Sequence, residues 1–359
     1  MILTPGQLYF INEQDVQTGT RSSYYKIGIV RDAAGRDSKN RLLEHQTGNP
    51  RKLCIVEALP MPAVEAIETN LHYLFARNRV MGEWMHFSDS ELLNAIKKAK
   101  ELAAEMEENI EDYKFAEILK NTKSNGSKLA ATAEAEEWYG TIQDLKEVLE
   151  TCDDALAQYD DYLYEAIERG IDVSGRAKVQ TRAGAKKFDE ALFASTYPEL
   201  YKKYSTSIFP VRGSFRVKPA KDWNPDLSAI NQEQVELLVE FKDQLLNADH
   251  SMDTGFALHE KHLGVLEIKK YVEWKIDIAN VKLRVMTGDA EGIEGICTWK
   301  REEKEVVTFD RTKLQAEHPE EYNACVVQGA ETTALIVEPK VAQNWCPQRK
   351  RRNHNKFKP

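Results

Sequence analysis

Four polar side chains near the N-terminus occupy positions where local structure alone would not put them. Tyr9 falls in the first short aromatic and β-branched run of the chain, and Lys26 falls inside the second. Arg41 and His45 are four residues apart, so a helix would place both on one face. A phenol, an imidazole and two cations can transfer protons or neutralise a phosphate. A lysine within a strand is more often a surface residue, so both interpretations of Lys26 stand.

The segment from about 63 to 77 predicts an amphipathic helix with a carboxylate at the margin of its buried face. At about 100° per residue, Glu68 lies beside the apolar stripe and His72 lies one turn further on the same side. The stripe consists of Val64, Ile67, Leu71, Leu74 and Phe75. A carboxylate bordering a core is costly unless it is paired or binds a cation. The helix alone leaves two alternatives, a Glu68–His72 pair or a Mg²⁺ ligand with a polar neighbour.

The elements that must position these side chains are short. Aromatic and β-branched runs predict strands at residues 7–12, 24–30 and 53–59. Residues 38–46 predict a short helix that carries the arginine and the histidine. The Gly82-Glu83-Trp84 run predicts a turn followed by a short extended piece.

Composition bounds the class of protein. The chain has 359 residues, of which 42% are apolar and 30% are charged, so it can build cores and is not a disordered chain. No run of about 18 apolar residues predicts a membrane span, and the N-terminus does not resemble a secretion signal. Five cysteines form no CxxC pair. We therefore expect a reduced, cytoplasmic protein of two or three domains.

The net charge of −9 is unevenly distributed along the chain. Residues 1–100 carry +2, residues 101–172 carry −14 and residues 173–359 carry +3. An acidic total therefore does not exclude a nucleic-acid partner, because the local potential decides binding. The basic segment at 341–359 allows two interpretations, a solvated tail or a non-specific phosphate contact.

The acidic segment predicts two long helices. The first begins after Ser88, which forms a capping box with Glu91, and runs to about residue 120. A KSNGSK break follows, and the second helix covers about 129–169. We expect the two helices to form a solvated antiparallel pair that spaces two domains.

Five of the elements described above, taken in order, resemble the GIY-YIG nuclease superfamily. They read Leu8-Tyr9-Phe10-Ile11, Tyr25-Lys26-Ile27-Gly28, Arg41-x-x-x-His45, Glu68-x-x-Leu71-His72-x-x-Phe75 and Gly82-Glu83-Trp84. The resemblance is to the branch common in phages, where K-I-G replaces Y-I-G and a G-E-W turn closes the domain. It covers about residues 6–96. The first signature reads Q-L-Y and lacks the family's glycine, and Lys26 stands where most members have a tyrosine.

The resemblance implies a small α/β domain, with a three-stranded antiparallel sheet and flanking helices, that acts as a metal-dependent phosphodiesterase. The catalytic positions fall on Tyr9, Lys26, Arg41, His45 and Glu68, with Glu68 as the ligand of Mg²⁺ or Mn²⁺. The general base stays open between Tyr9 and Lys26. Lys26 can take a proton from water if desolvation and Arg41 lower its pKa, and otherwise it neutralises the phosphate. The residues expected around this set are His72, Glu83 and His86.

Cations gather around the signature loops. Those expected to bind the phosphates of the substrate are Arg31, Arg36, Lys39, Arg51 and Lys52. Such a group suits contacts with a nucleic-acid backbone, although each residue by itself would also suit an ordinary charged rim.

An internal repeat lies in the second half of the chain. Residues 188–201 (FDEALFASTYPELY) and 309–322 (FDRTKLQAEHPEEY) share identities at a constant offset of 121. We infer a duplicated α+β module with units at about 129–220 and 229–340. The second unit resembles the C-terminal tail of YqaJ-type phage recombinase exonucleases, without the catalytic carboxylates of that family. The resemblance implies that the units bind DNA, protein or each other.

The sequence as a whole predicts a multidomain chain with α/β and α+β parts. The expected parts are a GIY-YIG-like nuclease domain at 1–96, a helical connector at 97–128, accessory units at 129–220 and 229–340, and a basic tail at 341–359. The expected function is a Mg²⁺-dependent endonuclease that cleaves DNA, encoded by a phage and active in the cytoplasm of a bacterial host. A protein partner is a further expectation for the repeats, and no membrane partner is expected. The alternative is a catalytically weak or inactive DNA- or protein-binding module that acts on a host partner.

Overall fold

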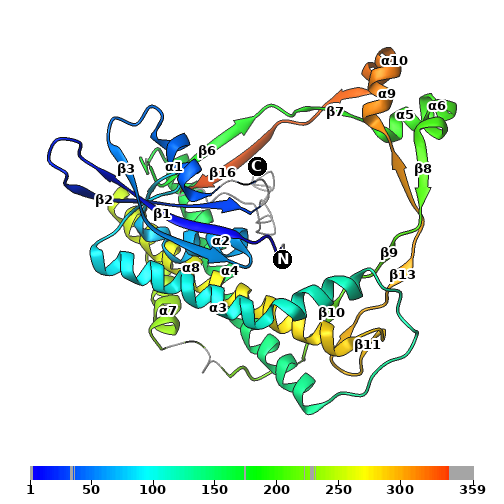
Figure 1. Ribbon diagram of the computed structural model, residues 1–359, viewed down its shortest axis with the longest axis horizontal. Helices are drawn as coiled ribbons and strands as arrows, with labels where there is room; N and C mark the ends of the chain where they lie inside the picture. The colour runs from blue at the N-terminus through cyan, green and yellow to red at the C-terminus, as the bar shows by residue number, and fades with distance from the viewer. Residues whose placement is uncertain are drawn as a thin grey trace.

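The computed structural model contains an N-terminal sheet domain, a body of long helices and a two-stranded arm (Figure 1). The residues that it describes are 3–32, 35, 37–173, 175–221, 223–226, 230 and 232–338. Arg36 and the basic segment 341–359 lie outside the described residues. Within these residues, no helix is long and apolar enough to cross a membrane. The expected mixture of helices and sheets is confirmed.

The N-terminal sheet is antiparallel, with its strands in the order β3-β1-β2-β5-β4. These strands are β1 (Gly6–Gln14), β2 (Arg21–Arg31), β3 (Lys52–Met61), β4 (Arg79–Met81) and β5 (Trp84–His86). The three predicted strands are neighbours in this sheet, with β3 at its edge. The expectation of only three strands is wrong, because Gly82 turns at a φ of +58° and folds β4 and β5 into a hairpin that pairs with β2.

Helices cover both faces of this sheet. Along β1, successive side chains point to opposite faces. The face that carries Tyr9 is covered by α1 (Ser38–Gln46), and the face that carries Phe10 is covered by α2 (Val64–Leu74). A short 3₁₀ turn, η1 (Ala76–Asn78), follows α2. Arg41 and His45 therefore approach the sheet from one face, while Glu68 approaches it from the other.

Four long helices form the body of the molecule (Figure 1). They are α3 (Asp89–Lys120), α4 (Ala133–Glu168), α7 (Gln232–Leu246) and α8 (Met252–Thr287). The predicted capping box of Ser88 and Glu91 at the start of α3 is confirmed. α8 is central, since it packs against the other three and also against α2. The expected pairing of the two acidic helices with each other is wrong, because each packs mainly against α8.

Basic residues of α8 compensate part of the acidic charge of its neighbours. Lys275 pairs with Glu105 on α3, and Lys269 pairs with Asp153 on α4. The buried Trp274 donates from its ring nitrogen to Glu105 at 2.9 Å. Exposed ion pairs contribute little stability by themselves, but here they accompany a buried apolar seam. The charge that the sequence places on the two acidic helices is thus partly neutralised within the fold.

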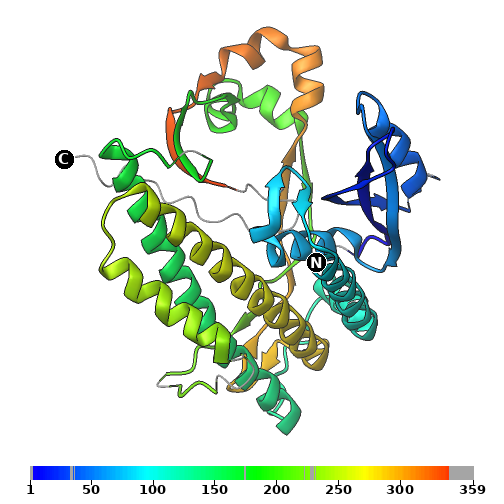
Figure 2. The ribbon, with the colours of Figure 1, turned by 90° about the vertical axis from the view of Figure 1, so that its left-hand side faces the viewer.

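The two repeat segments pair with each other strand by strand, always antiparallel. The pairs are β6 (Ala177–Arg182) with β16 (Thr332–Val337), β7 (Lys186–Phe188) with β15 (Val326–Gln328), β8 (Ser205–Ile208) with β14 (Val306–Phe309), β9 (Val211–Arg212) with β13 (Glu302–Glu303), and β10 (Arg216–Val217) with β12 (Cys297–Thr298), which also pairs with β11 (Gly292–Ile293). The result is an arm with two legs, which leave the helical body at separate places and meet at a helical tip (Figures 1 and 2).

The tip preserves the repeat as an approximate two-fold symmetry. Its helices are α5 (Glu190–Thr196), α6 (Pro198–Tyr204), α9 (Arg311–Glu317) and α10 (Pro319–Ala324). The Asp189 amide donates to the Cys325 carbonyl at 2.8 Å, and the Asp310 amide donates to the Tyr204 carbonyl at 2.9 Å. The two bonds are equivalent under the repeat, because Asp189 and Asp310 are 121 residues apart and so are Tyr204 and Cys325. Each unit therefore completes the fold of its copy.

Arg301 ties the base of the arm to the helical body. Its buried guanidinium donates to the carbonyl oxygens of Leu119 at 2.8 Å, Gly288 at 2.7 Å and Ala290 at 3.2 Å. It also lies 4.1 Å above the ring of Trp299. These contacts close the C-terminal ends of α3 and α8, where helix carbonyls lack partners in the helix itself.

We predict that Arg301→Met lowers the free energy of unfolding by about 2–4 kcal/mol, because buried carbonyls lose their charged donor. The matched control is Lys300→Met, which removes the same charge from a side chain that is 62% exposed and should cost less than about 0.5 kcal/mol. Urea denaturation followed by far-UV circular dichroism measures both. Equal losses in the two variants would contradict the assignment.

Candidate active site

Tyr9 and His45 meet on the face of the sheet that α1 covers. The Tyr9 hydroxyl lies 3.1 Å from His45 Nε2, and Tyr9 is buried. Burial raises the pKa of Tyr9. Burial and the nearby charge of Lys26 lower the pKa of His45. A protonated phenol therefore faces a neutral imidazole, which fits a hydrogen bond donated by the hydroxyl to Nε2.

Gly28 makes room for the ring of Tyr9. The two residues stand opposite each other in the β1–β2 ladder. A Cβ atom on residue 28 would lie 2.5 Å from the Tyr9 hydroxyl oxygen and 2.7 Å from its Cζ. The glycine of the K-I-G run is therefore required by the ring that lies against the strand.

Lys26 pairs with Glu83, which comes directly before the first residue of β5. The β2–β5 ladder stops with Lys26 opposite Trp84, and the Ile27 amide donates to the Glu83 carbonyl at 3.1 Å. The Lys26 side chain is 11% exposed, and its ammonium donates to the Glu83 carboxylate. Burial disfavours the charge on Glu83, but the hydrogen bond and charge of Lys26 hold the pKa of that carboxyl below its usual value.

Glu68 and His72 reach the same region from α2. Glu68 Oε1 lies 3.9 Å from His72 Nε2. Burial, with a smaller contribution from the charge of Glu83, raises the pKa of Glu68 from 4.5 to about 7 against the opposing effects of Lys26 and Arg31. Burial also lowers the pKa of His72 from 6.5 to about 4. The two side chains therefore form no ion pair near neutral pH.

Arg41 joins the cluster through Tyr9. A hydrogen bond and the charge of Arg41 act to lower the pKa of Tyr9, although burial outweighs both. The carboxylate partner of Arg41 is Glu44, three residues along α1. The half-exposed guanidinium thus borders the buried phenol and keeps one side open to solvent.

Side chains from both faces of the sheet come together beside β2, at the point where its pairing with β5 stops. The charges of Glu68 and Glu83 both act on Tyr9, and the charge of Lys26 acts on Glu68 and on His45. All five residues of the predicted catalytic set therefore belong to one electrostatic cluster. Glu83, expected only beside that set, lies at its centre, because it pairs with Lys26 and its charge acts on the others.

Glu68 fits a divalent cation by the chemistry of its surroundings. Among the described residues, no group of three or more His, Cys, Asp or Glu is arranged to hold a metal ion. A cation here would thus take a single carboxylate as its protein ligand, and Mg²⁺ is often held by one or two carboxylates, with water and phosphate oxygens completing its shell. Burial keeps the pKa of Glu68 raised although the charges of Lys26 and Arg31 act to lower it. A bound cation would add a further positive charge beside this carboxylate and would favour its charged form.

The expected phosphate-binding cations are spread around the domain. Arg31 on β2 pairs with Glu65 on α2, and its charge acts on Glu68. Arg51 lies 3.4 Å from Glu13 on β1. Arg31, Lys39 and Lys52 are exposed. Among the described members of this set, Arg31 is the one whose charge acts on Glu68.

The β4–β5 hairpin adds a residue that the sequence analysis missed. Arg79 is half-buried, burial lowers its pKa, and the charges of Glu83 and Glu68 act to raise it. Its only signal in the sequence is a basic residue just before the Gly82 turn. His86, expected beside the catalytic set, instead packs against Tyr24 with ring centroids 5.4 Å apart.

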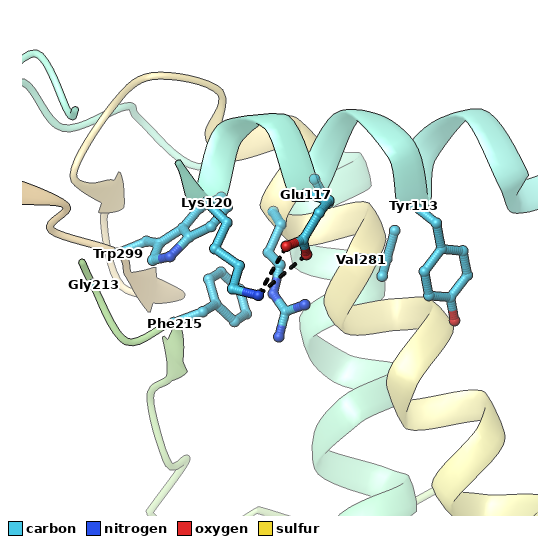
Figure 3. Close-up of a pocket in the computed structure, with 9 residues that line it drawn as sticks. Tyr113, Glu117, Lys120, Gly213, Phe215, Val281 and Trp299 are labelled. Atoms are coloured by element: carbon cyan, nitrogen blue, oxygen red, sulfur yellow. Dashed lines mark hydrogen bonds and ion pairs between the residues drawn. The ribbon is translucent and has the colours of Figure 1, made fainter. Parts of the chain in front are cut away.

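A separate cavity of about 210 Å³ lies between α3, α8 and the base of the arm (Figure 3). Phe215 and Trp299 meet edge to face at 5.7 Å, and the Arg284 guanidinium lies 5.1 Å above Phe215. Lys120 Nζ lies 2.9 Å from the Glu117 carboxylate. Because Lys120 pairs with Glu117 and Arg284 packs on the Phe215 ring, we interpret this cavity as part of the joint between arm and body.

We predict that Gly28→Ala lowers the free energy of unfolding by about 1–3 kcal/mol, because the added methyl collides with the Tyr9 ring. The matched control is Gly140→Ala in α4, where the new Cβ meets no atom closer than 3.6 Å and stability should stay equal or rise by up to about 1 kcal/mol. In a Tyr9→Ala background, Gly28→Ala should cost much less. Thermal and urea unfolding measure all of these, and an unchanged cost in that background would refute the collision.

Comparison with known proteins identifies no relative of this chain. Family models, curated proteins and solved structures were compared with it, and none matches. The candidate site is therefore defined by its own geometry, namely the Tyr9–His45 and Lys26–Glu83 pairs beside the buried carboxylate of Glu68.

Proposed function

We propose that the N-terminal domain is a metal-dependent nuclease of the GIY-YIG type that hydrolyses phosphodiester bonds in DNA. The observation that carries this proposal is the convergence of a phenol–imidazole pair, a buried ammonium and a buried carboxylate beside β2, the central strand of the sheet. Hydrolysis of a phosphodiester needs an activated water, positive charge beside the phosphate and help for the leaving oxygen.

The Tyr9–His45 pair is the proposed source of the general base. The pKa of Tyr9 is raised by burial, so the phenol alone is a poor base near neutral pH. The neutral imidazole of His45 accepts its hydrogen bond and can receive its proton. Tyr9 then removes a proton from the attacking water while passing its own to His45.

Lys26 and Arg41 are the proposed electrostatic groups. The Lys26 ammonium donates to the Glu83 carboxylate, and we assign it to neutralising the phosphate rather than to taking a proton. Arg41 presents a half-exposed planar guanidinium beside Tyr9, which suits two oxygens of one phosphate. Of the two candidates for the base that the sequence left open, this assignment favours Tyr9.

Glu68 is the residue that would hold the metal ion. When bound, a Mg²⁺ ion supplies Lewis-acid stabilisation of the charge that develops on the phosphate. Burial disfavours the charged form of Glu68, and a bound cation would stabilise that form. The neutral imidazole of His72 lies beside the carboxylate and can orient it. A salt bridge between Glu68 and Arg41 would have favoured a non-catalytic module; in the described residues Arg41 pairs with Glu44 instead.

We predict that Glu68→Gln lowers Mg²⁺-dependent DNA cleavage by about 10²–10³-fold, since the substitution keeps the shape but removes the charge. Tyr9→Phe should act in the same direction. Glu101→Gln, on the exposed surface of α3, is the control and should retain full activity. The measurement is cleavage of plasmid and linear DNA with and without Mg²⁺. Activity that survives both site substitutions would remove the proposed site.

A second prediction concerns how the free energy of unfolding depends on pH, and it can be tested without any measurement of catalysis. The folded pKa of Glu68 is about 7 against an ordinary 4.5, so the folded state holds a proton that the unfolded state has released. Its contribution to stability is full below pH 4.5 and is lost as pH rises to about 7. In metal-free buffer, the stability of the wild type relative to Glu68→Gln should fall across this window. Millimolar Mg²⁺ should reduce the fall, and a pH-independent difference would contradict the assignment.

A further inference from the structure

One leg of the arm carries a row of cations on an isolated two-stranded ribbon. We call this ribbon the basic leg; it comprises residues 176–188, with strands β6 and β7, and residues 326–338, with β15 and β16. The first strand contributes Arg176, Lys178, Arg182, Lys186 and Lys187 and no acidic residue. The returning strand contributes only Glu331 and Glu338. The basic leg thus has a net charge of +3.

The cations of the basic leg differ from those elsewhere in the molecule. Lys178, Arg182, Lys186 and Lys187 are exposed, and in the described part of the chain none of them pairs with a carboxylate. Arg182 donates to Gln180, a neutral partner, at 2.9 Å. By contrast, the lysines on the surface of α3 pair with glutamates of the same helix. The free cations of the leg therefore present uncompensated positive charge to solvent.

The middle of the leg is also exposed. Near the helical body, Leu335 and Val337 pack against the core of α4, α7 and α8, and further along the strands of the leg contact mainly each other. An isolated two-stranded ribbon is only marginally stable in water, and this one is held at one end by the helical body and at the other by the tip (Figure 1). The fold thus leaves the middle of the ribbon, residues 181–187 and 327–332, largely exposed to solvent.

The dimensions of the leg match the major groove of B-form DNA. Two strands lie about 4.8 Å apart, and the groove, about 12 Å wide, admits a two-stranded β-ribbon. Lys178, Arg182 and Lys186 alternate onto one face of the ribbon and span eight residues, or about 26 Å along an extended chain, which lies within one turn of the duplex at about 34 Å. Lys187 lies on the other face. In A-form RNA the major groove is too deep and narrow for such an element.

We propose that the basic leg binds the backbone and major groove of double-stranded DNA and holds the duplex for the N-terminal site. This inference rests on the proposed function, since it names how the substrate of that site is held. Lys178, Arg182, Lys186 and Lys187 contact phosphates. By the approximate two-fold symmetry, the second leg offers a related surface with the exposed cations Arg212, Arg216 and Lys218. Its returning strand carries three cations and three glutamates, and Lys300 and Lys304 are paired with Glu302.

The test compares two charge-matched variants of the full chain. The leg variant changes Lys178, Arg182, Lys186 and Lys187 to Gln, and the control changes Lys97, Lys98, Lys114 and Lys120 on α3 to Gln. Fluorescence anisotropy with a labelled DNA duplex of about three helical turns, in EDTA to prevent cleavage, gives Kd across a series of salt concentrations. Thermal unfolding verifies that both variants fold.

The leg variant should bind at least about tenfold more weakly, and the slope of log K against log salt should lose about 3–4 units, since four phosphate contacts each contribute about 0.9. The control should bind like the wild type, and duplex RNA should bind more weakly than DNA. Equal binding by the leg variant and the wild type would overturn the proposal, as would equal weakening in the control or equal affinity for duplex RNA.

Two further outcomes separate this inference from the nuclease assignment. Binding that depends on the leg, without any Mg²⁺-dependent cleavage, would support the leg and refute the nuclease. Cleavage that Glu68→Gln abolishes, with wild-type binding by the leg variant, would support the nuclease and refute the leg. Displacement of DNA by polyglutamate at equal charge concentration would indicate an acidic protein as the partner and would also refute the proposed DNA contact.

Discussion

The carboxylates of Glu68 and Glu83 are both largely buried beside β2, and the site depends on how their negative charge is balanced. Burial disfavours the charged form of both Glu68 and Glu83. Lys26 compensates Glu83 directly, which leaves Glu68 with a pKa of about 7. The imidazoles of His45 and His72 have lowered pKa values and contribute no positive charge near neutral pH. A cation or a cation-bound phosphate would complete this balance, and the proposed function assigns that role to the metal ion and the substrate.

The helical body holds the carboxylate of Glu68 in place. α8 packs against α2, with Lys270 Nζ 4.5 Å above the ring of Tyr73 and Arg77 paired with Glu267 at 2.9 Å. Apolar residues of the sheet, α2, α3 and α8 form one continuous core. A change in the packing of α8 would therefore be transmitted to the site through α2. The predicted boundary at residue 96 falls within α3, whose first turns belong to this shared core.

Each of the two duplicated segments needs the other to satisfy the backbone hydrogen bonds of its strands. Each unit contributes single strands and two short helices, and a single extended strand has no backbone partner. Antiparallel pairing across an approximate two-fold axis supplies those partners and builds a small aromatic core at the tip, where Phe188 stacks on Tyr322 with centroids 4.6 Å apart. Divergence between the copies then changes the placement of charge without changing the fold, because Lys300 and Lys304 of the second leg are paired with Glu302, whereas Lys178 and Lys187 of the basic leg are not paired with a carboxylate in the described residues.

Local patterns in the sequence determined much of the site. Alternation of apolar residues predicts the central strands, helical spacing places Glu68 at the margin of a buried stripe, and the Ser88 capping box marks the start of α3, because each pattern depends on residues close in sequence. Only the tertiary structure decided that Glu83 stands at the centre of the cluster, that side chains from opposite faces meet where β5 ends, and that α8 separates the acidic helices. These features depend on strand register and on packing between distant segments, which local periodicity does not encode.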